Sequence, residues 1–279
     1  MKRLGQKGNH NHIHRSMMKY AYEEPKQALS ARIQAHQQYS NFSLHDWLKG
    51  SFELMPGHRV FDLGCGDGNY TRLFWDQIQP SGFYLGLDKN IDLINEAKNR
   101  FSDLPKDQVQ FVVHDFDTPL PYGYDSFDWV FAIYSLYYAK DSLRLIYDIR
   151  EKMTAKGCFV VIGPGPDNIK DLWAFNYRLI GEKGERERVQ RIAGEFIISF
   201  EQFFPKKNIH YEEINSEMRF PTAEAFAEYY WSTLLWRESV RDKSSQEIDQ
   251  YKLETLKRAE YIMGLRIKKQ ISVLIGKKG

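Results

Sequence analysis

The chain has 279 residues, of which 42% are hydrophobic and 15% aromatic, so it can bury the core of one large α/β domain or of two small ones. Its 39 lysines and arginines against 37 aspartates and glutamates leave a formal net charge of +2, which is too small to indicate nucleic acid as an obligatory partner. The two cysteines give no disulfide framework, and no apolar run reaches the roughly 18 residues needed to cross a bilayer.

The first residues, 1–18, are polar and carry histidines at alternate positions, His10, His12 and His14. Alternate histidines can form a metal-binding tract, but no acid or cysteine lies beside them. The composition therefore favours a disordered tail, and no metal site is predicted. No apolar segment follows the basic residues at the N-terminus, so a secretory signal is not expected and the protein is expected to be cytoplasmic.

Helical periodicity over residues 24–49 predicts an N-terminal arm, after which strand and helix patterns alternate. Short β-branched and aromatic runs, which can be buried on both faces of a sheet, predict strands over 59–63, 82–87, 109–114, 128–133 and 158–163. Helices are predicted between them over 69–78, 91–101 and 141–153. This alternation is typical of an α/β fold with a doubly wound parallel sheet, in which ligands bind at the carboxyl ends of the strands.

The regular alternation ends after residue 165. The patterns that follow predict helices over 167–181 and 185–204, a strand over 209–220, helices over 222–236 and 244–265, and a last strand over 270–275. We predict a single domain over residues 19–279, whose parts are the arm at 24–49, a cofactor-binding core at 56–165, a helical substrate lid at 166–205, and C-terminal strands and helices at 206–279. The lid is an insertion between the fifth and sixth strands.

The most informative motif follows the first predicted strand, where Asp62 precedes three alternate glycines, Gly64, Gly66 and Gly68. Glycine lets the backbone turn tightly and lets a ligand approach the main chain closely. An acid beside such a turn can accept a hydrogen bond from a ligand amine or hydroxyl. The nicotinamide fingerprint G-x-G-x-x-G would require a glycine where Asn69 stands, so the spacing D-x-G-x-G-x-G disfavours a dinucleotide.

Acidic residues also end the next two predicted strands, at Asp88 and Asp115. A carboxylate at the end of the second strand can accept both hydroxyls of a ribose in a charge-assisted, bidentate pairing. Nicotinamide-binding folds share that acid, so Asp88 does not discriminate between the two cofactor classes. The glycine turn and the acids together predict a nucleotide-like ligand.

These motifs, the segment at 127–138 and the approach to the fifth strand at 153–157 resemble the class I S-adenosylmethionine-dependent methyltransferases over about residues 56–165. The resemblance extends loosely to the small-molecule enzymes of ubiquinone and biotin pathways. It implies a Rossmann-like seven-stranded sheet, mostly parallel with an antiparallel last strand. It also implies S-adenosyl-L-methionine as cofactor and S-adenosyl-L-homocysteine as product.

The resemblance further implies which residues bind the cofactor. They come from the turn, from the two later acids with their neighbours, and from the end of the fourth strand: Asp62, Gly64, Cys65, Gly66, Asp88, Lys89, Asp115, Phe116, Ala132 and Ile133. In the family, the acid after the third strand accepts from the adenine amino group. Structural alternatives stay open: Asp62 bracing the turn, Asp88 capping the helix before Asn90, and Asp115 forming an Asx turn with Thr118.

The resemblance names no catalytic residue. Many relatives carry two histidines after the fourth strand, and this chain has Tyr137 and Tyr138 there. A phenol can orient a substrate or pass a proton, but its ordinary pKa of about 10 makes it a poor base at neutral pH. These tyrosines are therefore candidates either for such a role or for packing at the edge of the sheet.

The predicted reaction is methyl transfer to the oxygen or nitrogen of a small organic molecule. Aromatic residues are frequent in segments 24–49 and 167–205, and they could line an apolar pocket for such an acceptor. No Asn- or Asp-Pro-Pro-Tyr turn of the kind found in base-methylating enzymes follows the fourth strand. The alternatives left open are a methyltransferase acting on RNA or protein, an NAD(P)-dependent oxidoreductase, and a non-catalytic cofactor-binding module. The oligomeric state is not predicted.

Overall fold

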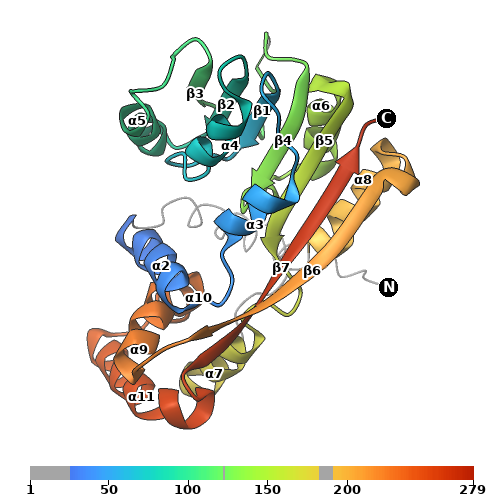
Figure 1. The fold of residues 1–279 in the computed structure, drawn as a ribbon. Helices are drawn as coiled ribbons and strands as arrows, with labels where there is room; N and C mark the ends of the chain where they lie inside the picture. Colours follow the sequence, from blue (N-terminus) through green and yellow to red (C-terminus); the bar gives the residue numbers. More distant parts are fainter. Residues whose placement is uncertain (1–25, 122, 182–190) are drawn as a thin grey trace, which may run out of the picture. The chain divides into compact units, whose positions relative to one another are not determined.

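The computed structural model describes residues 26–121, 123–181 and 191–279, so the predicted tail at 1–18 lies outside the described residues. The described chain forms two compact units (Figure 1). The larger unit takes its described residues from Ser40–Asp171, Glu185–Arg219 and Arg266–Gly279, and the smaller one from Met1–Tyr39, Leu172–Gly184 and Phe220–Leu265. That residues 19–279 belong to a single domain made of these two units stays a prediction.

Within the described ranges, the larger unit is built on a seven-stranded sheet of order β3-β2-β1-β4-β5-β7-β6. The strands are β1 Arg59–Leu63, β2 Phe83–Asp88, β3 Val109–Val113, β4 Phe127–Ile133, β5 Met153–Pro164, β6 Ile209–Arg219 and β7 Arg266–Lys277. Neighbouring strands from β1 to β5 pair in parallel, whereas β7 pairs antiparallel with both β5 and β6. The predicted Rossmann-like sheet with an antiparallel last strand is confirmed.

Helices cover both faces of this sheet, which explains why its central strands are almost entirely apolar. Successive residues of β1, Val60 and Phe61, are both buried but belong to two different hydrophobic clusters, because side chains alternate across a strand. The first cluster takes in α3 Leu44–Ser51, α4 Thr71–Ile78 and α5 Ile91–Arg100, and the second takes in α6 Ser142–Lys152 and α8 Ile197–Phe203.

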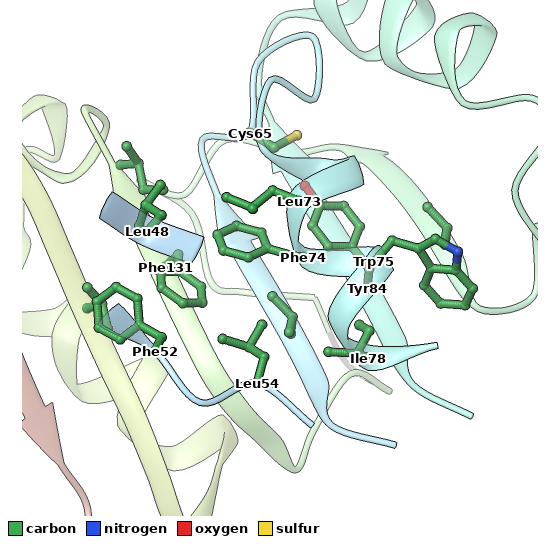
Figure 2. Packing of buried hydrophobic residues seen from close by; sticks show 14 of the residues in the cluster. Leu48, Phe52, Leu54, Cys65, Leu73, Phe74, Trp75, Ile78, Tyr84 and Phe131 are labelled. Atoms are coloured by element: carbon green, nitrogen blue, oxygen red, sulfur yellow. The ribbon is translucent and has the colours of Figure 1, made fainter. Parts of the chain in front are cut away.

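Figure 2 shows the first cluster around helix α4, whose side chains Leu73, Phe74 and Ile78 face the sheet. Phe74 is fully buried and stacks on Phe131 of β4 with ring centroids 4.4 Å apart. Aromatic pairs of this kind add about 0.5–1.5 kcal/mol to the stabilisation from burial alone. The start of α4 is thereby held against the carboxyl half of the sheet, directly after the glycine turn.

Some predicted boundaries were wrong, each for a local reason. The predicted helix 222–236 is interrupted, because Thr233 is extended and ends α9 Ala223–Ser232 while its hydroxyl caps α10 Leu234–Ser239. The predicted arm 24–49 is likewise two helices, α2 Lys26–Tyr39 and α3, because the Ser43 side chain starts a new helix by accepting from the Asp46 N–H. Strand β5 begins at Met153, which pairs with Phe127 across a register shift.

The lid predicted between the fifth and sixth strands contains α7 Lys170–Ile180, a π-helical turn at Ile192–Phe196, and α8. Part of the predicted helix 185–204 lies outside the described residues. In the smaller unit, α7, α9 and α11 Ser245–Met263 enclose fully buried aromatic side chains. There Tyr230 donates to the Asn176 Oδ1 at 2.6 Å, and the Asn176 amide donates to Ser239 at 3.0 Å, so these three buried side chains are linked by hydrogen bonds.

Among the described residues, no helix combines the length and the apolar character that crossing a membrane requires.

Candidate active site

The turn after β1 is built from three glycines with left-handed backbone conformations. Gly64, Gly66 and Gly68 have φ values of 78°, 56° and 79°, a region that residues with a Cβ rarely adopt. Two N–H groups of this turn, those of Gly64 and Cys65, donate to the carbonyl of Leu87 at 2.6 and 3.0 Å. The turn is therefore fastened to the carboxyl end of β2, and it leads into α4.

Each glycine meets a different neighbour. A Cβ at Gly64 would lie 2.3 Å from the Cβ of Ser135, and a Cβ at Gly68 would lie 2.6 Å from the ring of Phe101, so packing excludes a side chain at both positions. A Cβ at Gly66 would meet only one atom within 4 Å, a methyl carbon of Leu93 at 4.0 Å. Gly66 is thus the member of the turn above which a ligand could approach the backbone.

Asp88, at the end of β2, is tied to the same turn. Its Oδ2 accepts from the N–H of Gly66 at 3.0 Å, and its Oδ1 accepts from the N–H of Asn90 at 2.9 Å. The cap of helix α5 is Asn90, whose side chain accepts from Asp92 and Leu93, so Asp88 does not cap that helix. Each carboxylate oxygen has a second lone-pair site, which leaves Asp88 able to accept from two hydroxyls.

Asp115, two residues after β3, forms an Asx turn. Its Oδ1 accepts from the N–H of Asp117 at 3.0 Å, whereas Thr118 donates to the backbone carbonyl of Asp115. Burial lowers the pKa of Lys89, and the negative charges of Asp115 and Asp117 oppose this change. Lys89 therefore lies close enough to both acids to interact with their charge. Phe116 is 7% exposed and belongs to the second cluster, so its contact with an adenosine stays a prediction.

The end of β4 packs onto the glycine turn. Tyr134 has a φ of 55°, and this left-handed residue turns the chain so that Ser135 lies against Gly64. The Ser135 hydroxyl donates to the carbonyl of Leu63 at 2.5 Å. Ala132 and Ile133, which the family pattern places beside the sulfonium, are both buried. Sequence analysis missed Ser135, because its contact with the turn joins segments far apart in the chain.

Tyr137 and Tyr138 are half-buried beside the second cluster, with ring centroids 4.4 Å apart. The guanidinium of Arg191 donates to the carbonyls of Tyr137 and Ala139 at 2.6 and 2.8 Å, and it forms an ion pair with Glu195 at 2.7 Å. Arg191 therefore secures the segment after β4, a role that no sequence pattern marked. This arrangement favours packing for the two tyrosines.

Asp62 is the most unusual group of the site. It is 2% exposed, and the hydroxyl of Tyr84 donates to its Oδ2 at 2.8 Å. Burial raises the pKa of Asp62 from 3.8 to about 7; the Tyr84 hydrogen bond opposes this rise and the charge of Asp88 adds to it. No cation among the described residues contributes to this pKa, so within that part of the chain the buried carboxyl has no positive partner. A ligand with a positive group would fit such a position.

Comparisons with known proteins agree on one family. Residues 54–216 match the family described as methyltransferase domain. Demethylmenaquinone methyltransferase from Listeria monocytogenes serotype 4a is 24% identical over 133 residues, which are 46% of this chain and 56% of that protein. The chain thus spans about half the length of the relatives of this name that it matches.

Solved structures show the same fold at low identity. The YcgJ protein of Bacillus subtilis has a TM-score of 0.54 and 14% identity, over 84% of this chain and 97% of that one. A methyltransferase from Geobacter sulfurreducens, crystallised with S-adenosyl-L-homocysteine, has a TM-score of 0.52 and 16% identity, over 91% of this chain and 99% of that one.

The raised pKa of Asp62 predicts how stability depends on pH. Folding favours the protonated carboxyl, so its stabilising contribution is fully present below pH 4 and is lost as the pH rises to about 7. In Asp62→Asn the group does not titrate. Urea unfolding between pH 4.5 and 8 should therefore show that the wild type loses free energy of unfolding relative to Asp62→Asn, by about 3 kcal/mol over this range. A difference that is the same at every pH would contradict this assignment.

Proposed function

Because the chain belongs to the methyltransferase domain family, as its motifs predicted, we propose that it transfers a methyl group from S-adenosyl-L-methionine to the oxygen or nitrogen of a small organic molecule. The observation that carries the proposal is the convergence of the glycine turn with Asp62, Asp88 and Asp115 at the carboxyl ends of the parallel strands β1, β2 and β3. The name of the relative, demethylmenaquinone methyltransferase, describes a small organic acceptor and supports that class of substrate.

The residues at this edge suit the parts of the cofactor. Gly66 leaves room for a close approach to the backbone, and Asp88 can accept from both ribose hydroxyls. Asp115 would accept from the adenine amino group, with Lys89 and Phe116 beside the adenosine. Gly64, Cys65, Ala132 and Ile133 complete the proposed cofactor-binding residues, which lie in the turn and at the end of β4.

Asp62 favours this cofactor over a dinucleotide. The amino-acid end of S-adenosylmethionine carries an ammonium group, which a buried carboxylate attracts. The pyrophosphate of NAD(P) above the same turn would instead bring negative charge toward Asp62 and Asp88, and the charge of Asp88 already raises the pKa of Asp62. The NAD(P)-dependent oxidoreductase left open by the sequence is therefore disfavoured by charge.

The chemistry that the cofactor supplies is a methyl group already activated by the positive sulfur. The protein has to bind both reactants and align them, and alignment can contribute about 7–11 kcal/mol. The turn and the acids serve the binding, while Ser135 and Arg191 hold the segment after β4 in place. We assign no catalytic base, since Tyr137 and Tyr138 are engaged in packing.

Substitution of the ribose-binding acid tests the cofactor site. Asp88→Ala should weaken the binding of S-adenosylhomocysteine about a hundredfold or more, because two charge-assisted hydrogen bonds are lost. Isothermal titration calorimetry measures this. Asp76→Ala, the same change on the exposed face of α4, should bind as the wild type does. Wild-type affinity in Asp88→Ala would refute the assignment, and binding of NAD(H) in place of S-adenosylhomocysteine would favour the oxidoreductase.

A second experiment identifies the acceptor class. The protein is incubated with S-adenosylmethionine carrying a labelled methyl group and with the small molecules, RNA and protein of a bacterial lysate in separate fractions. We expect the label to appear in the small-molecule fraction, as a compound whose mass increases by one methyl group. Label in the RNA or protein fraction alone would overturn the small-molecule assignment. Cofactor binding without any transfer would indicate a non-catalytic module.

A further inference from the structure

A chain of buried hydroxyl groups runs beneath the glycine turn. The Thr71 hydroxyl donates to the Tyr84 hydroxyl at 2.9 Å, and the Tyr84 hydroxyl donates to the Asp62 Oδ2 at 2.8 Å. The three residues come from α4, β2 and β1, and their exposed fractions are 0%, 0% and 2%. The chain of hydrogen bonds therefore links the helix, the second strand and the buried acid of the turn.

The surroundings of Tyr84 are those of an apolar side chain. It belongs to the first cluster, lies edge-on to Phe111 with ring centroids 5.8 Å apart, and appears in Figure 2 beside the α4 residues that cover the sheet. A phenylalanine would fill this space equally well. A buried hydroxyl without partners destabilises the fold, so the hydroxyl is tolerated because Thr71 and Asp62 both bond to it.

The direction of these two hydrogen bonds follows from the ionised state of Asp62. An ionised Asp62 can only accept, so the one phenolic proton of Tyr84 goes to it, and Tyr84 in turn accepts from Thr71. The Asp62 carboxyl is thus held by Oδ2, while its Oδ1 makes no hydrogen bond with any described residue. One oxygen anchors the acid, and the other is left for a ligand.

We propose that Tyr84, held by Thr71, is a positioning residue for cofactor binding, whose hydroxyl fixes the Asp62 carboxylate so that it accepts from the ammonium group of the cofactor. This inference rests on the proposed function and deepens it. Tyr84 touches Asp62 and acts through it; the contact with the cofactor is made by Asp62.

The charged and titratable groups around Asp62 give this positioning a pH signature. They are Asp88 at the end of β2, Tyr84 in the same strand, and Cys65 and Tyr70 in the turn segment. Burial raises the pKa of the Cys65 thiol, and it raises that of Tyr70 to about 12, so both stay neutral near pH 7. The Tyr84 hydroxyl is the donor that favours the ionised form of Asp62, and its loss would raise the pKa of Asp62 further.

The test is Tyr84→Phe, which removes the hydroxyl and keeps the ring. Binding of S-adenosylhomocysteine is measured by calorimetry at intervals from pH 6 to 8.5. At pH 7 we expect the affinity to fall about fivefold, because a rise of about one unit from a pKa of about 7 lowers the ionised fraction of Asp62 from about one half to about one tenth, and the deficit should shrink as the pH rises. Thr71→Val, which leaves Tyr84 without its donor, should produce a smaller shift in the same direction.

Tyr124→Phe is the matched control, because the Tyr124 hydroxyl also forms a hydrogen bond, to Gln110 at 3.0 Å, and takes no part in the site. Its affinity should equal that of the wild type at every pH. Wild-type affinity in Tyr84→Phe would overturn the inference, and so would a loss of the same size at every pH, which a merely structural role would produce. If the wild type bound no S-adenosylhomocysteine, the proposed function would fail and this inference with it.

Discussion

The structure of the site depends on one backbone constraint, the passage from β1 to α4 through three left-handed residues. Gly64, Gly66 and Gly68 let the chain reverse within a few residues, so that the N–H groups of the turn reach Leu87 and Asp88 at the end of β2. A side chain at any of the three would strain this backbone. The turn thereby joins the ends of two neighbouring strands, and the ligand edge of the sheet is formed around it.

Close packing extends this constraint to the rest of the edge. The space that Gly64 leaves is occupied by Ser135 after β4, and the space that Gly68 leaves is occupied by Phe101 at the end of α5. Beneath the turn, Tyr84 and Thr71 hold Asp62. Of these three glycines, Gly66 has the most room, because a Cβ there would meet only a Leu93 methyl carbon at 4.0 Å. The elements around the turn thus fix its shape on every side except the one from which a cofactor would approach.

The sequence predicted the sheet and the family because their signals are local. Strand β1 was predicted with its observed bounds, since its five residues are flanked by turn-forming glycines and buried on both faces. The start of β5 was missed, because Ala155, Lys156 and Gly157 resemble a turn; in the structure they lie in the register shift between the Met153–Phe127 and Cys158–Trp129 pairs. The break at Thr233 was also missed, because no glycine or proline marks it.

The site was predicted less completely, for a physical reason. Motif spacing identified Asp62, Asp88 and Asp115, but the partners that hold them come from distant parts of the chain. A tyrosine inside a strand pattern reads as core, and nothing local shows that Tyr84 donates to a buried acid 22 positions away. Ser135 and Arg191 act through backbone carbonyls, which accept from any residue type and leave no pattern in the sequence.

The central claim, that the glycine turn binds the cofactor, is tested most directly by amide hydrogen exchange with and without S-adenosylhomocysteine. The account predicts slower exchange in residues 64–70 and 88–93, because the ligand would cover the turn and the start of α5, with unchanged exchange in α11 of the smaller unit. Saturating ligand that left residues 64–70 and 88–93 unchanged, or protection confined to other segments, would contradict it.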